Sequence, residues 1–292
     1  GPDRLGRRPA RRGPGASHAP RHGRGRRLMT PLLTRRAVLG TALAASVIGS
    51  ARAASPLRIG TTAGPVGQTL GVAAKLAKAQ GQDVEIVEFT DWVTPNEAVA
   101  TGSLDANLFQ HVPFLNSAIK ARGYALVPVA PAIILPVGLF SKSLKRLEDV
   151  PRGASVAIAN DPVNAARGLH LLEKAGLLTL KAGLGDEVTV ADVVQNPKGL
   201  RILELDAAQL PRVLDDVALA QISFTYLIAA GGDPKTALIT DGAGDRHYTL
   251  SFVARPNNRD DKRLTAFIAS YRSPEVKQFL LDRYGGFLEP AW

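Results

Sequence analysis

Strand-like and helix-like patterns of apolar residues alternate along the first half of the chain. LRIGTTAG (57–64) is a short apolar run ending in a turn, and DVEIVEFTDW (83–92) alternates apolar and polar positions as a half-buried strand does. Residues 67–81, between them, show helical spacing. A helix at TPNEAVATGS, a strand at LDANLF and a helix at VPFLNSAIKARG follow. This alternation predicts a doubly wound α/β lobe with a parallel sheet.

A second cycle of elements follows a long proline-containing run at 125–141, ALVPVAPAIILPVGLFS. Its three prolines exclude a helix, so we expect an extended strand that leaves one lobe and enters another. ASVAIANDP then begins a strand and a helix, and 200–231 is predicted to add a strand, an amphipathic helix and a further strand. YTLSFVARP (248–256) is the candidate return crossover. The helical C-terminal segment, from 261 onward, is expected to pack on the first lobe.

These elements predict an α/β clam-shell of two lobes joined by two crossover strands. Lobe 1 comprises residues 54–138 and 250–292, and lobe 2 comprises residues 139–249. The 239 residues after position 53 are enough for two lobes with separate cores. A ligand is expected in the cleft between the lobes, because sites in open α/β sheets lie at the carboxyl ends of strands.

Residues 1–53 differ in composition from the rest of the chain. They hold twelve of the 36 basic residues and one of the 26 acids, so the remainder carries 24 basic and 25 acidic side chains despite a formal net charge of +10. A nucleic-acid-binding protein carries its positive charge on its folded part, so this distribution argues against that class. Residues 1–28 are expected to be disordered or to precede the true start at the sole Met, Met29.

The stretch that follows, MTPLLTRRAVLGTALAASVIGSARAAS, has the organisation of a signal peptide. A basic pair precedes a short apolar run and a small-residue cleavage site, which predicts a signal peptide at 29–53 cut near Ala53–Ala54. Its paired Arg are typical of the twin-arginine route. The apolar run is too short to span a membrane. Because the chain has no Cys, we expect no disulfide and no lipid attachment, and therefore a soluble periplasmic protein.

Two clusters of residues carry candidate binding chemistry. Trp92, Phe109, His111 and Phe114 lie near predicted strand ends, where aromatic faces and one imidazole could surround an apolar or thioether side chain. The alternative is a core aromatic cluster that contains a hydrogen-bonded His.

The second cluster, ANDPVNAARG, contributes Asn160, Asn164 and Arg167 at a helix start. Arg167 and Asn164 share a helix face, and a guanidinium binds a carboxylate through two parallel hydrogen bonds. The alternative is that Asn160 or Asp161 only caps the helix while Arg167 pairs with a surface acid.

Signals for catalysis or metal binding are sparse. Ser223 or Thr225 could offer hydroxyls to a ligand, or bond to the backbone of a buried strand. The common hydrolase, metalloprotease and nucleotide-binding motifs are missing from the chain, and the three His after position 53 lack the spacing of a metal set. We therefore predict neither an enzyme nor a metal or cofactor.

Three stretches resemble the NlpA-type methionine-binding lipoproteins, the substrate-binding components of methionine ABC importers. They are EFTDWVTPNEAVATGSLDANLFQHVPFL, VAIANDPVNAARGLHLLEKAGLL and ELDAAQLPRVLDDVALAQI, and the similarity extends over roughly 56–284. The resemblance implies a type II periplasmic-binding-protein fold and a protein that delivers methionine, or a related amino acid or short peptide, to an ABC transporter. The protein itself is expected to be monomeric.

The resemblance also implies roles for the two clusters. Trp92, Phe109, His111 and Phe114 correspond to the family's side-chain pocket, and Arg167, with Asn160 and Asn164 nearby, corresponds to its carboxylate-binding group.

The chain departs from the family pattern at several positions. Thr225 replaces a usual Asn, Leu135 a usual Tyr, and Trp92 and Phe114 usual Tyr residues, while the lipid-bearing Cys is missing. The replaced amide and phenol groups could each form hydrogen bonds worth about 0.5–1.5 kcal/mol. Because these bonds are lost, the ligand could also be a more apolar small acid. Two rival hypotheses are an enzyme with His111 as its base and a sensory or structural protein.

Overall fold

Six strands build the first sheet, in the order β13-β4-β12-β3-β1-β2. Their bounds are β1 Leu57–Thr62, β2 Val84–Phe89, β3 Ala106–His111, β4 Val127–Ile134, β12 Thr249–Ala254 and β13 Glu289–Pro290. β1 pairs in parallel with β2 and β3, whereas β12 runs antiparallel to β3 and β4, and β13 antiparallel to β4. The expected parallel pairing is therefore found only among β1, β2 and β3, because β12 returns from the second sheet in the opposite direction and lies between β3 and β4.

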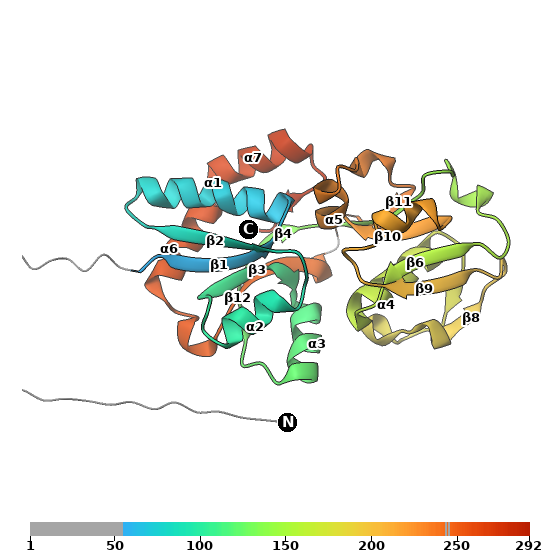
Figure 1. The fold of residues 1–292 in the computed structure, drawn as a ribbon, viewed down its shortest axis with the longest axis horizontal. Helices are drawn as coiled ribbons and strands as arrows, with labels where there is room; N and C mark the ends of the chain where they lie inside the picture. Colours follow the sequence, from blue (N-terminus) through green and yellow to red (C-terminus); the bar gives the residue numbers. More distant parts are fainter. Residues whose placement is uncertain (1–54, 243, 245) are drawn as a thin grey trace, which may run out of the picture. The chain divides into compact units, whose positions relative to one another are not determined.

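Five helices belong to this sheet. They are α1 Pro65–Ala79, α2 Thr94–Ala100, α3 Val112–Arg122, α6 Lys262–Tyr271 and α7 Pro274–Tyr284. In Figure 1, α1 and α7 lie above the sheet and α2 and α3 below it. α6 and α7, the C-terminal helices, both contact α1.

Five further strands form the second sheet, in the order β11-β5-β10-β6-β9. They are β5 Val137–Phe140, β6 Ser155–Ala159, β9 Arg201–Leu205, β10 Leu219–Ser223 and β11 Ile239–Thr240, accompanied by α4 Pro162–Lys174 and α5 Phe224–Ala229. β7 Thr179–Leu180 and β8 Val193–Gln195 form a small hairpin. Short 3-10 helices span Leu147–Asp149, Gly185–Glu187, Val190–Asp192, Arg212–Asp215, Pro234–Thr236, Arg246–Tyr248 and Pro256–Asn258.

One prediction within 200–231 was wrong. The expected amphipathic helix is a turn followed by the 3-10 helix Arg212–Asp215, because Pro211 cannot donate a helical hydrogen bond and interrupts the segment. The following strand ends at Ser223, and Phe224–Ala229 is helical. Thr225 is therefore a helical residue and not part of a strand.

The chain passes between the two sheets twice. β4 ends at Ile134 in the first sheet and β5 begins at Val137 in the second, so Leu135 and Pro136 interrupt the predicted single strand. The return occurs between β11 and β12, and β12 itself lies wholly in the first sheet instead of forming the crossover. Both changes of sheet fall close to the predicted lobe boundaries.

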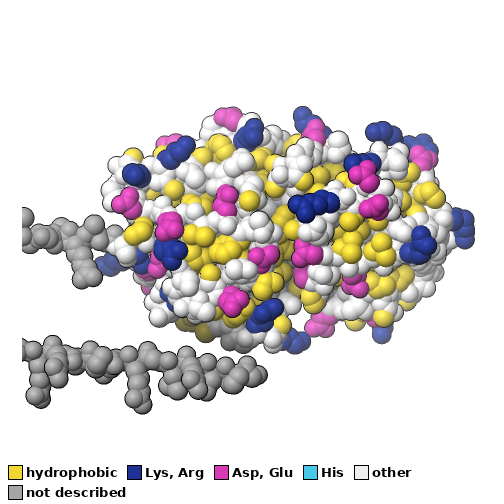
Figure 2. All heavy atoms as spheres, in the orientation of Figure 1, with side chains coloured by type: hydrophobic (Ala, Val, Ile, Leu, Met, Phe, Trp, Pro, Cys, Tyr) yellow, Lys and Arg dark blue, Asp and Glu magenta, His cyan; other side chains and the backbone are white. Residues whose placement is uncertain are grey.

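Residues 55–242, 244 and 246–292 are the part of the chain that the computed structural model describes. Residues 1–28, the signal peptide predicted at 29–53 and its cleavage site near Ala53–Ala54 lie outside the described residues. Within the described part, every helix is too short or too polar to cross a membrane. Lys and Arg side chains are interspersed with Asp and Glu on the face shown in Figure 2, in agreement with the near-neutral composition after residue 53.

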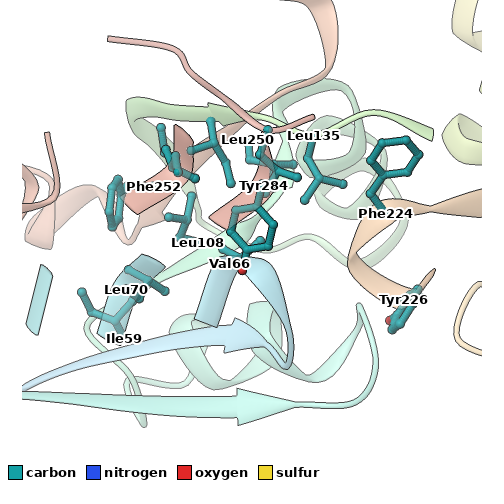
Figure 3. Close-up of a cluster of buried hydrophobic side chains, with 14 of the residues drawn as sticks. Ile59, Val66, Leu70, Leu108, Leu135, Phe224, Tyr226, Leu250, Phe252 and Tyr284 are labelled. Atoms are coloured by element: carbon teal, nitrogen blue, oxygen red, sulfur yellow. The ribbon is translucent and has the colours of Figure 1, made fainter. Parts of the chain in front are cut away.

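The buried core continues from the first sheet to the start of the second. Figure 3 shows Leu108, Leu250 and Phe252 from the six-stranded sheet in the same cluster as Leu135 of the crossover and Phe224 of α5. The five-stranded sheet has a second cluster of its own, packed against α4. The crossover is thus anchored in apolar packing next to the position where the candidate site residues meet.

Candidate ligand-binding pocket

A pocket lies where segments of the two sheets meet. Its outline takes in about 350 Å³, solvent-facing space included. The lining residues are Trp92, Phe109, Gln110, His111, Phe114, Leu135, Asn164, Arg167, Ser223, Thr225 and Leu250. The structure therefore brings seven of the eight predicted site residues together, and the eighth, Asn160, is exposed and does not line the pocket.

Aromatic rings form the wall contributed by the first sheet. The rings of Phe109 and Phe114 meet edge to face with centroids 6.0 Å apart, and Trp92 meets Phe114 in the same way at 6.1 Å. Tyr226, from α5, lies against Trp92 with centroids 5.0 Å apart. Such edge-to-face pairs leave ring faces and edges available to an apolar or sulfur-containing side chain.

His111 ends β3 and caps helix α3. Its Nδ1 accepts a hydrogen bond from the backbone N–H of Phe114, at 3.2 Å, so the proton of the neutral ring lies on Nε2. Nε2 lies 3.4 Å from Oδ1 of Asn164 on α4. Burial, reinforced by the positive charge of Arg167, lowers the pKa of His111 to about 3. The imidazole therefore presents a neutral N–H donor at the pocket.

This buried imidazole predicts a specific pH dependence of stability. The folded-state pKa is below the unfolded value of 6.5, so the unfolded chain takes up the proton first and stability is lost as pH falls below 6.5. Relative to His111→Asn, which keeps a capping acceptor, the wild type should lose about 2 kcal/mol of unfolding free energy between pH 6.5 and pH 5.

Urea unfolding at several pH values measures the difference directly. The matched control is His170→Asn, which alters a His at a partly exposed position on α4. Parallel pH profiles for the wild type and His111→Asn would show that the imidazole titrates normally in the folded protein.

Arg167 is the one cationic side chain in the pocket lining. Its Nε and Nη2 both contact Oδ2 of Asp241, each at 2.6 Å, and Nη2 also donates to the carbonyl of Leu135 at 3.1 Å. The guanidinium carbon lies 4.2 Å from the ring centroid of Tyr248. Arg167 thereby links α4 to both passages between the sheets, since Leu135 belongs to one and Asp241 to the other.

Asn164 occupies the first turn of α4 and is held by Asp161. Asp161 is the N-cap of the helix: its Oδ1 accepts from the Asn164 backbone N–H at 3.0 Å. The Asn164 amide nitrogen donates to both oxygens of the same carboxylate, at 3.0 and 3.1 Å. Because its NH₂ group is turned to Asp161, the amide oxygen faces His111 and the pocket.

The hydroxyl-bearing residues lie where β10 passes into α5. Ser223 ends β10, and Thr225 lies in the following helix with a side chain that is almost fully buried. Gly64 in the β1–α1 turn has φ of +110°, and a Cβ atom there would lie 3.2 Å from the Thr225 carbonyl. This turn therefore needs a glycine in order to approach α5 at the side of the pocket.

Sequence reasoning missed a buried amide network behind the aromatic wall. Gln110 and Asn96 are joined by reciprocal side-chain hydrogen bonds of 2.9 and 2.5 Å, and Asn107 donates to Asn96 Oδ1 at 2.9 Å. All three side chains are nearly inaccessible to solvent. The network links α2 to β3 and places Gln110 at the pocket. Its only signal in the sequence is three amide residues at positions that otherwise read as core.

Among the described residues, no group of three or more His, Asp or Glu side chains is placed to hold a metal ion. The lining of the pocket offers neutral hydrogen-bond donors and acceptors, aromatic surfaces and one paired guanidinium.

The family model described as NlpA lipoprotein matches residues 57–292. The D-methionine-binding lipoprotein MetQ of Escherichia coli O157:H7 is 42% identical over 239 residues, which are 81% of this chain and 88% of that protein.

Two solved structures show the same fold. A nutrient-binding protein from Burkholderia cenocepacia bound to methionine is 41% identical, with a TM-score of 0.78 over 81% of this chain and 100% of that one. A periplasmic substrate-binding protein of an ABC transporter from Coxiella burnetii is 42% identical, with a TM-score of 0.77 over 80% of this chain and 100% of that one. The α/β clam-shell predicted from the sequence is therefore confirmed.

Proposed function

Because the chain belongs to the NlpA lipoprotein family, we propose that it is the substrate-binding protein of an ABC importer and binds methionine or a closely related amino acid. One observation carries this proposal. The pocket sets aromatic rings from the first sheet opposite Arg167 and Asn164 from α4. An amino acid with an apolar side chain needs both kinds of surface. The aromatic rings contact its side chain, and the polar groups bind its carboxylate and ammonium, which lie only a few bonds away.

The two ends of the ligand meet different groups in this proposal. Trp92, Phe109 and Phe114 surround the side chain, and the edges of their rings make favourable contacts with a thioether sulfur. Arg167 and the His111 Nε2–H bind the α-carboxylate, while the Asn164 amide oxygen accepts from the ammonium group.

Binding is coupled to closure of the two lobes, 54–138 with 250–292 and 139–249. The pocket residues come from both lobes, so a ligand contacts all of them only when the lobes are together. Arg167, bonded to both passages between the lobes, carries the ligand contact to the hinge.

The substitutions in this pocket favour an apolar ligand end. Phe114 and Leu135 present carbon atoms at positions where the family usually presents a phenol, and Trp92 packs on Tyr226. The proposed partner is the membrane complex of an ABC importer, and the proposed location is the periplasm, after removal of a signal peptide. The compared relatives include lipoproteins, whereas this chain has no Cys to carry a lipid.

The relatives compared above are binding proteins and not enzymes. His111 also lacks a free basic nitrogen, since Nδ1 is engaged by Phe114 and Nε2 carries the proton. His111 therefore does not fit the role of a catalytic base.

Ligand release and thermal stability test the proposal. Mass spectrometry of small molecules released from the denatured, purified protein should identify methionine or a related amino acid. After removal of that ligand, methionine at about 100 times its Kd should stabilise the protein by about 2.7 kcal/mol, seen as a rise in Tm. No shift with any amino acid or Met dipeptide, in protein shown to be free of ligand, would contradict it.

A further inference from the structure

Two carboxylates stand directly behind the polar side chains of the pocket without lining it. We propose that Asp161 and Asp241 make the pocket selective for a zwitterionic amino acid over the same compound without its amino group. This inference rests on the proposed function, and it decides between an amino acid and a simple apolar acid as the substrate class.

Asp241 balances the charge of Arg167. Its Oδ2 contacts Nε and Nη2 of Arg167, and its Oδ1 accepts from the backbone N–H of Val137 at 3.1 Å. Only 6% of the Arg167 side chain and 14% of the Asp241 side chain are exposed. A ligand carboxylate therefore meets a guanidinium that is already paired with Asp241. The guanidinium can orient the carboxylate through hydrogen bonds, but it adds little excess positive charge to the pocket.

Asp161 is a carboxylate without a cation. Among the described residues it forms no ion pair, and its hydrogen bonds come from Asn164. Burial raises the pKa of Asp161, as expected for a carboxylate that lacks a compensating charge. Its contact with the Asn164 NH₂ group fixes the amide so that Oδ1 faces the pocket, which is the orientation an ammonium group requires.

The remaining titratable group in the lining does not alter this balance. His111 is neutral because burial lowers its pKa to about 3. The pocket and the groups bonded to its polar side chains thus hold one positive charge, on Arg167, and two negative charges, on Asp161 and Asp241. A zwitterionic ligand places its ammonium group near Asp161, the carboxylate that has no cationic partner among the described residues. A ligand that carries only a carboxylate increases the net negative charge at the pocket.

Isothermal titration with matched ligand pairs tests the inference. The pairs are L-methionine with 4-(methylsulfanyl)butanoate and L-leucine with 4-methylpentanoate, which differ within each pair only by the amino group. The wild type, stripped of ligand, should prefer the amino acid by at least about 100-fold. Asp161→Asn, which keeps the helix-capping acceptor, should reduce this preference at least about tenfold, or 1.4 kcal/mol.

Asp241→Asn is the second variant, and it should weaken amino-acid binding while improving binding of the acid. The control is Asp215→Asn, which removes an exposed carboxylate paired with Lys142 and should leave the preference unchanged. A preference that stays at the wild-type value in folded Asp161→Asn and Asp241→Asn would overturn the inference and leave the proposed function standing. Failure of the wild type to bind either amino acid would overturn both.

Discussion

Replacing Arg167 by methionine is expected to abolish detectable amino-acid binding, with a loss of affinity of at least about 100-fold. Charge-assisted hydrogen bonds to the ligand carboxylate would be lost from Nη1, the guanidinium nitrogen that does not contact Asp241 or Leu135. Each bond to a charged group is worth about 1.5–3 kcal/mol. The methionine side chain keeps much of the apolar stem. The same change leaves Asp241 buried without its partner, so the unfolding free energy should also fall by about 3–5 kcal/mol.

Titration calorimetry and urea unfolding of the same preparation separate the two effects. Arg167→Lys keeps a positive charge beside Asp241 but not the planar guanidinium, so it should recover stability more fully than binding. Arg146→Met, which breaks an exposed ion pair with Asp149, is the matched control and should change neither quantity. Methionine binding at wild-type affinity in Arg167→Met would remove Arg167 from the proposed site.

Replacing Asn96 by leucine is expected to destabilise the fold by about 2–4 kcal/mol, although Leu has nearly the same size. Asn96 exchanges hydrogen bonds with Gln110 and accepts one from Asn107. All three side chains are buried, so the substitution leaves Gln110 Oε1 without its donor and removes one acceptor each from the amide groups of Gln110 and Asn107, at about 1–3 kcal/mol for each unsatisfied group. Asn107 keeps its bond to the Pro95 carbonyl, and Gln110 Nε2 keeps its bond to Asn107 Oδ1. Because Gln110 lines the pocket, ligand affinity should fall as well.

Chemical denaturation measures the stability change, and titration with methionine measures the affinity. Asn257→Leu makes the same replacement at an exposed position and should alter the stability by no more than about 0.5 kcal/mol. An Asn96→Leu variant as stable as the wild type would mean that the amides are satisfied without Asn96.

Most of the pocket could be predicted from the sequence because its residues lie at the ends of local elements. Phe109 and His111 are two positions apart on β3 and therefore point to the same face of the strand. Phe114 lies one turn into the next helix, so strand and helix periodicity together place the three side chains on a common side. Asn164 and Arg167 share a helix face for the same reason. Asn160 differs because it precedes the N-cap, where no periodicity determines the direction of the side chain, and the structure exposes it to solvent.

The partners of these residues could not be predicted. Asp241 is 74 positions from Arg167, and nothing in its surroundings distinguishes it from an acid in a solvated loop. The amide network likewise depends on how α2 lies against β3. Hydrogen bonds between residues so far apart in the sequence depend on how whole helices and strands pack together. Such packing leaves no local pattern in the sequence.

The sequence by itself determined the α/β class, the two cycles of elements, the passage at the proline-rich run and the residue types that a pocket would need. Periodicity and proline chemistry act over a few residues, so these features can be read locally. Only the tertiary structure decided that β12 runs antiparallel to β3, that Thr225 is helical and that Arg167 is neutralised by Asp241. Those outcomes depend on distant segments that compete for the same buried space and charge.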